Sequence, residues 1–210
     1  MIAPPPLSKP WEKIRAEDVR RHLYVPMQER KQIEGTVKSV VDALQEHFHP
    51  QRVYLGGSYK KSTCLQSSYS IDLVIFIKEF NPMLSDTYKE HAGQALSANN
   101  VHYRRIEQTA CSLKVEVGTE YDRKPVLSCV LRFTGDPSEG PWWLSRLYRS
   151  LYSAATLPAT DDTILDGILK YPQVTDLILL AKFWKNQQPR LHHSVTSLFI
   201  EKASIEMMKQ

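Results

Sequence analysis

The strongest constraint on the fold is the stretch from Leu55 to Ile77, which reads LGGSYKKSTCLQSSYSIDLVIFI. Its last part, residues 71–77, is a nearly unbroken apolar run, the composition of a strand that is covered on both faces. Residues 52–55 form a shorter strand pattern that ends at Gly56 and Gly57, where the backbone can turn tightly. The pattern predicts two central strands that bracket a polar loop.

The rest of the chain divides into a strand-rich front half and a helical rear half. Apolar residues spaced by three and four predict a helix over residues 26–48, and residues 82–98 can form another. Alternation over residues 113–117 predicts a half-exposed strand, and residues 126–133 predict a further one. Helical spacing dominates the rear half, over residues 142–151, 164–169, 174–184 and 195–208. We therefore predict an α+β fold, in which helices flank a mixed sheet and a short helical lobe follows.

These elements suggest a division of the chain into three parts. Residues 1–10, MIAPPPLSKP, are rich in proline and are expected to form an irregular arm. The core lobe is expected to span residues 11–157, and residues 158–210 begin the helical lobe.

Composition excludes several classes of protein. With 210 residues, 42% of them hydrophobic, the chain can bury a globular core, and no apolar run approaches the roughly 18 residues of a membrane helix. No membrane partner is therefore expected. The net charge of +4, from 27 basic and 23 acidic residues, permits a nucleic-acid partner without requiring one. An odd number of scattered cysteines indicates a reducing, cytoplasmic location; they are Cys64, Cys111 and Cys129.

The polar loop between the two predicted strands is a candidate anion site. Backbone amides of the turn at Ser58 can point at an anion, and four polar residues follow, namely Lys60, Lys61, Ser62 and Thr63. Asp72, which opens the apolar strand, needs a metal ion or a hydrogen-bonding partner if it is buried. Alternatively, it is a strand-entry residue with its carboxylate in solvent. The glycine and lysine spacing of the ATPase phosphate loop is absent.

This segment resembles the signature of the polymerase-beta-like nucleotidyltransferases, and is most similar to that of the 2'-5'-oligoadenylate synthetases. The family pattern is Gly-Gly-Ser, followed by Lys, Thr and Leu at fixed spacing and then by Asp-x-Asp-Leu-Val-x-Phe. The matching residues are Gly56, Gly57, Ser58, Lys61, Thr63, Leu65, Asp72, Leu73, Val74 and Phe76. Further on, LILLAKFWKNQ (residues 177–187) resembles the family helix with the pattern Leu-Ile-x-Leu-x-Lys-x-Trp. Lys182 matches the lysine of that pattern.

The resemblance implies a nucleotidyltransferase fold and a particular site. The triphosphate of a nucleotide such as ATP would be held by the turn and by nearby polar residues, namely Gly57, Ser58, Lys61, Thr63 and Lys182. Asp72 would bind magnesium as the catalytic acid, together with an acid two residues earlier and a third on a neighbouring strand. One ion would activate a ribose hydroxyl, and the other would neutralise the leaving pyrophosphate.

The chain departs from the family pattern at the metal site. The position two residues before Asp72 is Ser70, and a hydroxyl cannot replace the charge of a carboxylate that bridges two ions. The strand expected to carry the third acid, residues 126–133, offers Ser128 and Cys129 instead; Glu116 and Asp136 are the alternatives. We therefore predict that magnesium binding is weak or absent and that catalysis is impaired.

The rear half departs from the family as well. Family members continue beyond this length with a larger helical lobe, so the chain is expected to be short at its C-terminal end. The expected Gln-Tyr nucleotide contacts read Ser194-Val195, and the segment before the lysine helix is acidic at Asp161, Asp162 and Asp166. That segment does not support activation by duplex RNA. A loose basic face on the first two helices is the remaining candidate for RNA contact: Arg15, Arg20, Arg21, Lys31 and Lys38.

Three functions follow as hypotheses. The first is a cytoplasmic, synthetase-like pseudoenzyme of innate immunity that binds a nucleotide or RNA, or regulates an active relative. The second is an active magnesium-dependent transferase that makes 2'-5'-linked oligoadenylates from ATP. The third is an interaction domain with no nucleotide site. The sequence indicates no oligomeric state.

Overall fold

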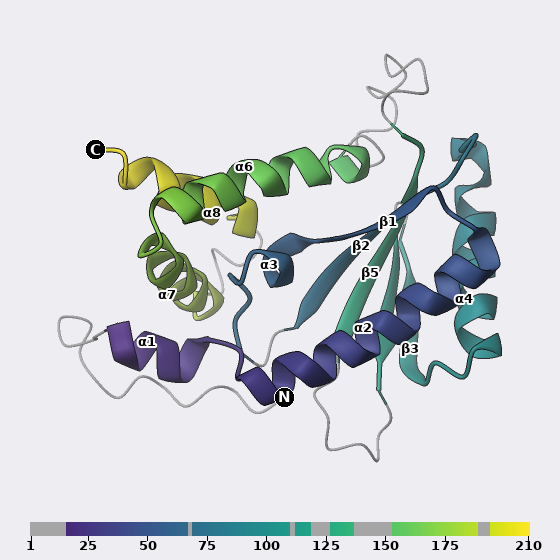
Figure 1. Cartoon of the computed structure of the whole chain (residues 1–210), viewed down its shortest axis with the longest axis horizontal. Helices are drawn as coiled ribbons and strands as arrows, with labels where there is room; N and C mark the ends of the chain where they lie inside the picture. The colour runs from purple at the N-terminus through teal and green to yellow at the C-terminus, as the bar shows by residue number, and fades with distance from the viewer. Residues whose placement is uncertain (1–15, 67–68, 110–111, 119–126, 137–152, 189–193) are drawn as a thin grey trace.

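The computed structural model describes residues 16–66, 69–109, 112–118, 127–136, 153–188 and 194–210. Its centre is a five-stranded sheet in the order β1-β2-β5-β4-β3 (Figure 1). The strands are β1 (Arg52–Gly56), β2 (Ser70–Phe76), β3 (Tyr103–Gln108), β4 (Leu113–Val117) and β5 (Leu127–Thr134). Strands β2 and β5 are parallel, whereas the other neighbouring pairs are antiparallel. The predicted mixed sheet is confirmed.

Two long helices cover one face of this sheet. Helix α2 (Met27–Phe48) follows Pro26, and a short 3-10 turn, η2 (Pro82–Leu84), leads into α4 (Ser85–Ala98). Their apolar stripes meet the inward-facing residues of β2, β4 and β5 in the main core. The members contributed by β2 and the two helices include Ile71, Leu73, Ile75, Ile33, Val40, Leu44, Ala92 and Leu96. The predicted helices over residues 26–48 and 82–98 are therefore confirmed.

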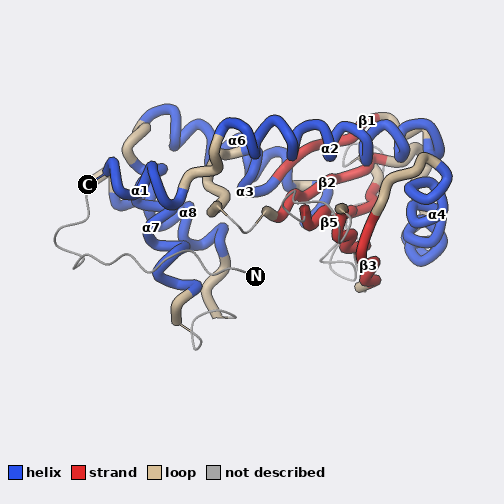
Figure 2. The backbone as a smooth tube through the Cα atoms, turned by 90° about the horizontal axis from the view of Figure 1, so that it is seen from below, coloured by secondary structure: helices blue, strands red, loops and turns tan. Residues whose placement is uncertain are grey.

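The remaining helices gather at one end of the sheet, as Figures 1 and 2 show. They are α1 (Ala16–Leu23), α3 (Gly57–Lys60), α6 (Leu157–Lys170), α7 (Val174–Asn186) and α8 (Ser197–Met207). Helices α6, α7 and α8 bury Ile164, Ile178 and Ile205 against one another. Helix α1 packs on α7 through Val19 and Leu23, which meet Leu179 and Phe183. The rear half is helical over its described residues, as predicted.

Two sheet predictions need correction. Strand β1 was expected to be central but lies at the edge, where it pairs only with β2 in the described sheet. It is also more exposed than a central strand, with a burial pattern that runs from exposed Arg52 to buried Gly56. Strand β3 was not predicted, because half of its sequence YRRIEQ is charged and most of it is exposed. Such a sequence suits the outer edge of a sheet, where charges discourage pairing with other chains.

Some expectations lie outside the described residues. These are the irregular arm at residues 1–10, the start of the core lobe at residue 11, and the helix predicted over residues 142–151. Among the described helices, none has both the length and the apolar character that crossing a lipid bilayer requires.

Candidate functional site

The Gly-Gly-Ser turn lies where β1 passes into α3, beside the start of β2. Gly57 has a φ of +80°, a conformation that side-chain-bearing residues rarely adopt. A Cβ atom at this position would collide with the carboxylate of Asp72. Glycine is therefore required both for the backbone turn and for the close approach of Asp72, which the sequence had placed in the site.

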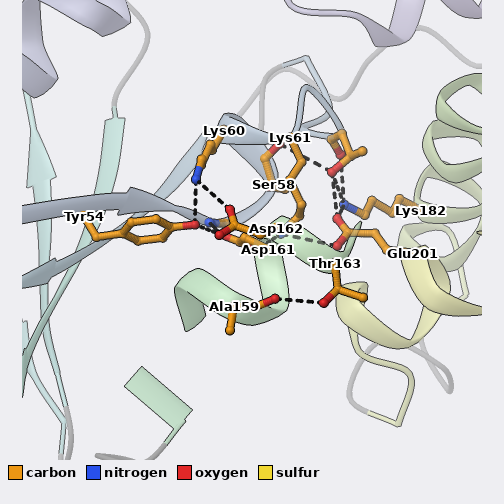
Figure 3. Close-up of polar contacts among 12 residues, drawn as sticks. Tyr54, Ser58, Lys60, Lys61, Ala159, Asp161, Asp162, Thr163, Lys182 and Glu201 are labelled. Atoms are coloured by element: carbon orange, nitrogen blue, oxygen red, sulfur yellow. Dashed lines mark hydrogen bonds and ion pairs between the residues drawn. The ribbon is translucent and has the colours of Figure 1, made fainter. Parts of the chain in front are cut away.

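Asp161 of α6 reaches into this turn from the rear helices. Its carboxylate is fully buried and accepts a hydrogen bond from the backbone N–H of Gly57 at 2.8 Å. The Tyr54 hydroxyl donates to the same oxygen at 3.3 Å, and the Lys61 ammonium forms an ion pair with the other (Figure 3). The amide that could have faced a phosphate therefore already donates to an internal anion.

Glu201 of α8 completes the cluster on the other side. It accepts hydrogen bonds from Lys182 Nζ at 2.6 Å and from Thr63 Oγ1 at 2.7 Å, and it lies 3.4 Å from Lys61 Nζ. Lys182 also donates to the Thr63 carbonyl oxygen at 2.9 Å. Figure 3 shows Asp161 and Glu201 converging on the two lysines. Two cations and two anions meet in this buried cluster, whose formal charge sums to zero.

Burial affects the titration of Lys182. Desolvation lowers the pKa of the Lys182 ammonium below its ordinary value, although the neighbouring Glu201 carboxylate opposes this effect. A buried ion pair needs both partners, because either charge alone would be left unsolvated. We therefore define Lys61, Asp161, Lys182 and Glu201 as the buried charge cluster.

The structure brings together most of the residues that the resemblance assigned to nucleotide binding. Lys61 and Lys182 belong to the buried charge cluster, and Gly57 and Thr63 donate to its two acids, so the partners of all four are protein groups. Sequence reasoning did not single out Asp161 and Glu201 as site residues. A signal for them existed: Lys182 lies within the apolar run LILLAKFW, and a lysine buried there needs an acid from another element.

Asp72 has a different partner, which the sequence analysis missed. Its Oδ1 atom lies 3.3 Å from Nη2 and 3.4 Å from Nε of Arg132, on β5. Strand pairing sets Asp72 beside Val130, so the side chain of Arg132, two residues further along, lies on the same face. The two side chains are 24% and 31% exposed, so this ion pair faces solvent in part. Asp72 therefore does not match the alternative of a strand-entry acid whose only partner is solvent.

The two alternatives for a third acid do not lie beside Asp72. Glu116 pairs in register with Ser128, two strands away from β2, and lies 3.8 Å from the Lys114 ammonium. Asp136 follows the far end of β5 and lies 3.9 Å from Arg52. Within the described ranges, no group of three or more His, Cys, Asp or Glu side chains could hold a metal ion. The described residues therefore do not fit a pair of magnesium ions, which needs several oxygen ligands of negative charge.

Of the remaining predicted site residues, Ser58 stays half-buried at the surface of the turn, and its carbonyl accepts from the Thr63 amide at 2.9 Å. Lys60 donates to the Tyr54 hydroxyl at 2.8 Å and lies 3.5 Å from Asp162. Cys64 is buried, and burial raises the pKa of its thiol, which disfavours the reactive thiolate. Ser58 and Asp72 are thus the predicted site residues that face the surface.

Comparison with known proteins finds similarity at the level of structure. No model of a known family matches the sequence, and no curated protein does either. Among solved structures, the chain is similar to Cid1 poly(U) polymerase with MgGTP bound, at a TM-score of 0.56 and 16% identity. That alignment covers 81% of this chain and 46% of Cid1, so the chain spans less than half of that protein.

Two further structures align over more of the chain. The GLD-2/RNP-8 complex gives a TM-score of 0.63 at 13% identity, and covers 93% of this chain and 64% of the other. The CdnC:HORMA-deltaN complex of E. coli MS115-1 gives 0.65 at 16% identity, with 92% and 63% covered. At such low identity, similarity establishes the fold alone. The chain thus shares the α+β nucleotidyltransferase fold of these structures.

Proposed function

We propose that this protein is a catalytically impaired nucleotidyltransferase-fold protein, similar to 2'-5'-oligoadenylate synthetases, that binds a nucleotide and regulates an active relative in the cytoplasm. The observation that carries this proposal is the ion pair between Asp72 and Arg132, at 3.3 Å. The carboxylate expected to bind magnesium is compensated by a protein cation instead. Transfer chemistry that depends on two metal ions has no second carboxylate to use at Ser70.

The buried charge cluster supports the same proposal. Lys61 and Lys182, which would contact the triphosphate in an active relative, are 5% exposed each and are paired with Asp161 and Glu201. A triphosphate that approached them would add negative charge to a cluster that is already neutral. Nucleotide contact is therefore assigned to the exposed side of the turn, at Ser58 and the partly exposed Arg132, and we expect weak binding.

RNA is the less favoured ligand. The similar structures include a poly(U) polymerase and a cytoplasmic RNA terminal U-transferase, so RNA is worth testing. On the basic face of the first two helices, however, Arg20 lies 3.6 Å from Asp176 and Lys38 lies 2.8 Å from Asp42. These pairs reduce the positive charge that would attract a phosphate backbone.

Two measurements on purified protein test the proposal. With labelled ATP and Mg²⁺, we expect no product above the protein-free blank. With unlabelled ATP, we expect a rise in melting temperature, because a ligand that binds only the folded state stabilises it. The variant Ser58→Ala should show a smaller rise, whereas Ser39→Ala, at an exposed serine of α2, should behave as the wild type.

The alternatives predict other outcomes. Consumption of ATP that requires Mg²⁺ and disappears in Asp72→Asn would establish an active transferase. No rise in melting temperature with ATP, and none with RNA, would favour a pure interaction domain.

A further inference from the structure

The outer face of β2 and β5 carries an arginine close to the position where a third carboxylate was expected. Ser70 pairs with Ser128, and Asp72 with Val130, so the next outward residue of β5 is Arg132. Its guanidinium lies beside the Asp72 carboxylate and donates to Oδ1 through both Nη2 and Nε. Among the described residues, this guanidinium has no other hydrogen-bond partner.

The other outward-facing groups of β2 and β5 near Asp72 are neutral. Ser70 is an exposed hydroxyl, and the Ser128 hydroxyl oxygen is buried without a hydrogen-bond partner among the described residues. Magnesium requires near-octahedral coordination by oxygen at about 2.0–2.1 Å. An ion at that distance from Asp72 would lie within a few ångströms of a guanidinium, whose charge is permanent. The guanidinium and a divalent cation therefore compete for one carboxylate.

Resting on the function proposed above, we propose that Arg132 supplies the positive charge that a divalent cation would otherwise bring to Asp72. The ligand of this face is then a metal-free nucleoside polyphosphate. A guanidinium is suited to this role, because its planar fork of donors matches phosphate as well as carboxylate. Its partial exposure, 31%, leaves it accessible to a ligand from solvent.

The first arm of the test measures metal binding without nucleotide, by electron paramagnetic resonance of Mn²⁺. We expect no protein-bound signal for the wild type. The double variant Ser70→Asp with Arg132→Ser restores the paired acid and removes the cation, and should bind Mn²⁺ at least about tenfold more tightly. The matched control is Ser70→Asp with Lys114→Ser, which removes a cation two strands from β2 on the same face and should stay close to the wild type.

The second arm compares the ATP-induced rise in melting temperature of the wild type in EDTA and in Mg²⁺. A rise in EDTA at least as large as in Mg²⁺ supports the inference, whereas a rise only in Mg²⁺ overturns it. If ATP gives no rise in either buffer, the proposed function fails, and the Mn²⁺ arm still decides the role of Arg132. Wild-type Mn²⁺ binding as tight as that of the double variant overturns this role. So does a double variant that shows wild-type circular dichroism yet binds no Mn²⁺.

Discussion

Gly57 determines how closely the Gly-Gly-Ser turn approaches Asp72. At a φ of +80°, any side chain is strained, and the first carbon of that side chain would meet the Asp72 carboxylate. We expect Gly57→Ala to lower the free energy of unfolding by about 1–3 kcal/mol, measured by urea denaturation. It should also displace Asp72 from Arg132.

Gly35 is the matched control for this prediction. It lies at an exposed position inside α2, and an added Cβ atom meets nothing within 4 Å. Gly35→Ala should therefore raise the free energy of unfolding by about 0.5–1 kcal/mol, since alanine favours the helix. A loss of stability at Gly35 equal to that at Gly57 would show that the strained turn is not the cause.

The partners of individual charges were the part of the site that sequence reasoning could not supply. Arg132 lies 60 residues from Asp72 in the chain, and Asp161 lies 104 residues from Gly57. Nothing in the local pattern selects one distant partner over another. Period two along β5 does place Arg132 on the outer face, but only the parallel pairing with β2 brings it to Asp72.

Elements were predicted well where the local pattern is strong. Strand β2 and helix α2 agree with prediction to within one residue at each end, because each has an apolar pattern that suits one structure alone. Strand order is different, since it depends on contacts between distant segments. The short strand pattern of β1 suits an edge and a central position, so its placement at the edge could not be deduced.

Helix α1 is tied to α7 by a hydrogen bond that depends on pH. The Tyr24 hydroxyl donates to Asp176 at 2.9 Å, and burial together with this carboxylate raises the pKa of Tyr24 to about 12. The unfolded chain ionises first, near its ordinary pKa of 10.0, so the stabilisation is complete below this pH and is lost as the pH rises toward 12.

We therefore expect the wild type to lose stability between about pH 10 and about pH 12, and Tyr24→Phe to lose less over the same interval. Urea denaturation at several pH values in this interval gives the two slopes. Burial also raises the pKa of Tyr54, on β1. The variant Tyr54→Phe therefore serves as the comparison. Parallel curves for Tyr24→Phe and the wild type would exclude the contribution of this bond.

At the scale of the whole molecule, the buried charge cluster joins the sheet to the rear helices. Lys61 follows α3, Lys182 belongs to α7, Asp161 to α6 and Glu201 to α8. Glu201→Gln keeps the shape of the side chain but leaves two lysines without their shared anion. We expect this variant to lose about 3–5 kcal/mol of stability, because an unpaired buried charge is strongly unfavourable. Chemical denaturation provides the measurement.

Glu206→Gln is the control for this loss. Glu206 pairs with Lys209 on the exposed side of α8, where an ion pair contributes little. Its replacement should leave the denaturation midpoint unchanged within the error of measurement. Equal effects at Glu201 and Glu206 would mean that the cluster does not hold the two parts together.

The cluster also has a consequence for kinetics. Glu201 meets Thr63 across 138 residues of chain, and Asp161 meets Lys61 across 100. Contacts between such distant segments carry a large entropic penalty of loop closure and tend to form after the local helices and hairpins. Interactions that are absent from the transition state act on the rate of unfolding. These four charges would then govern how long the native state survives, and have little influence on how quickly it is reached.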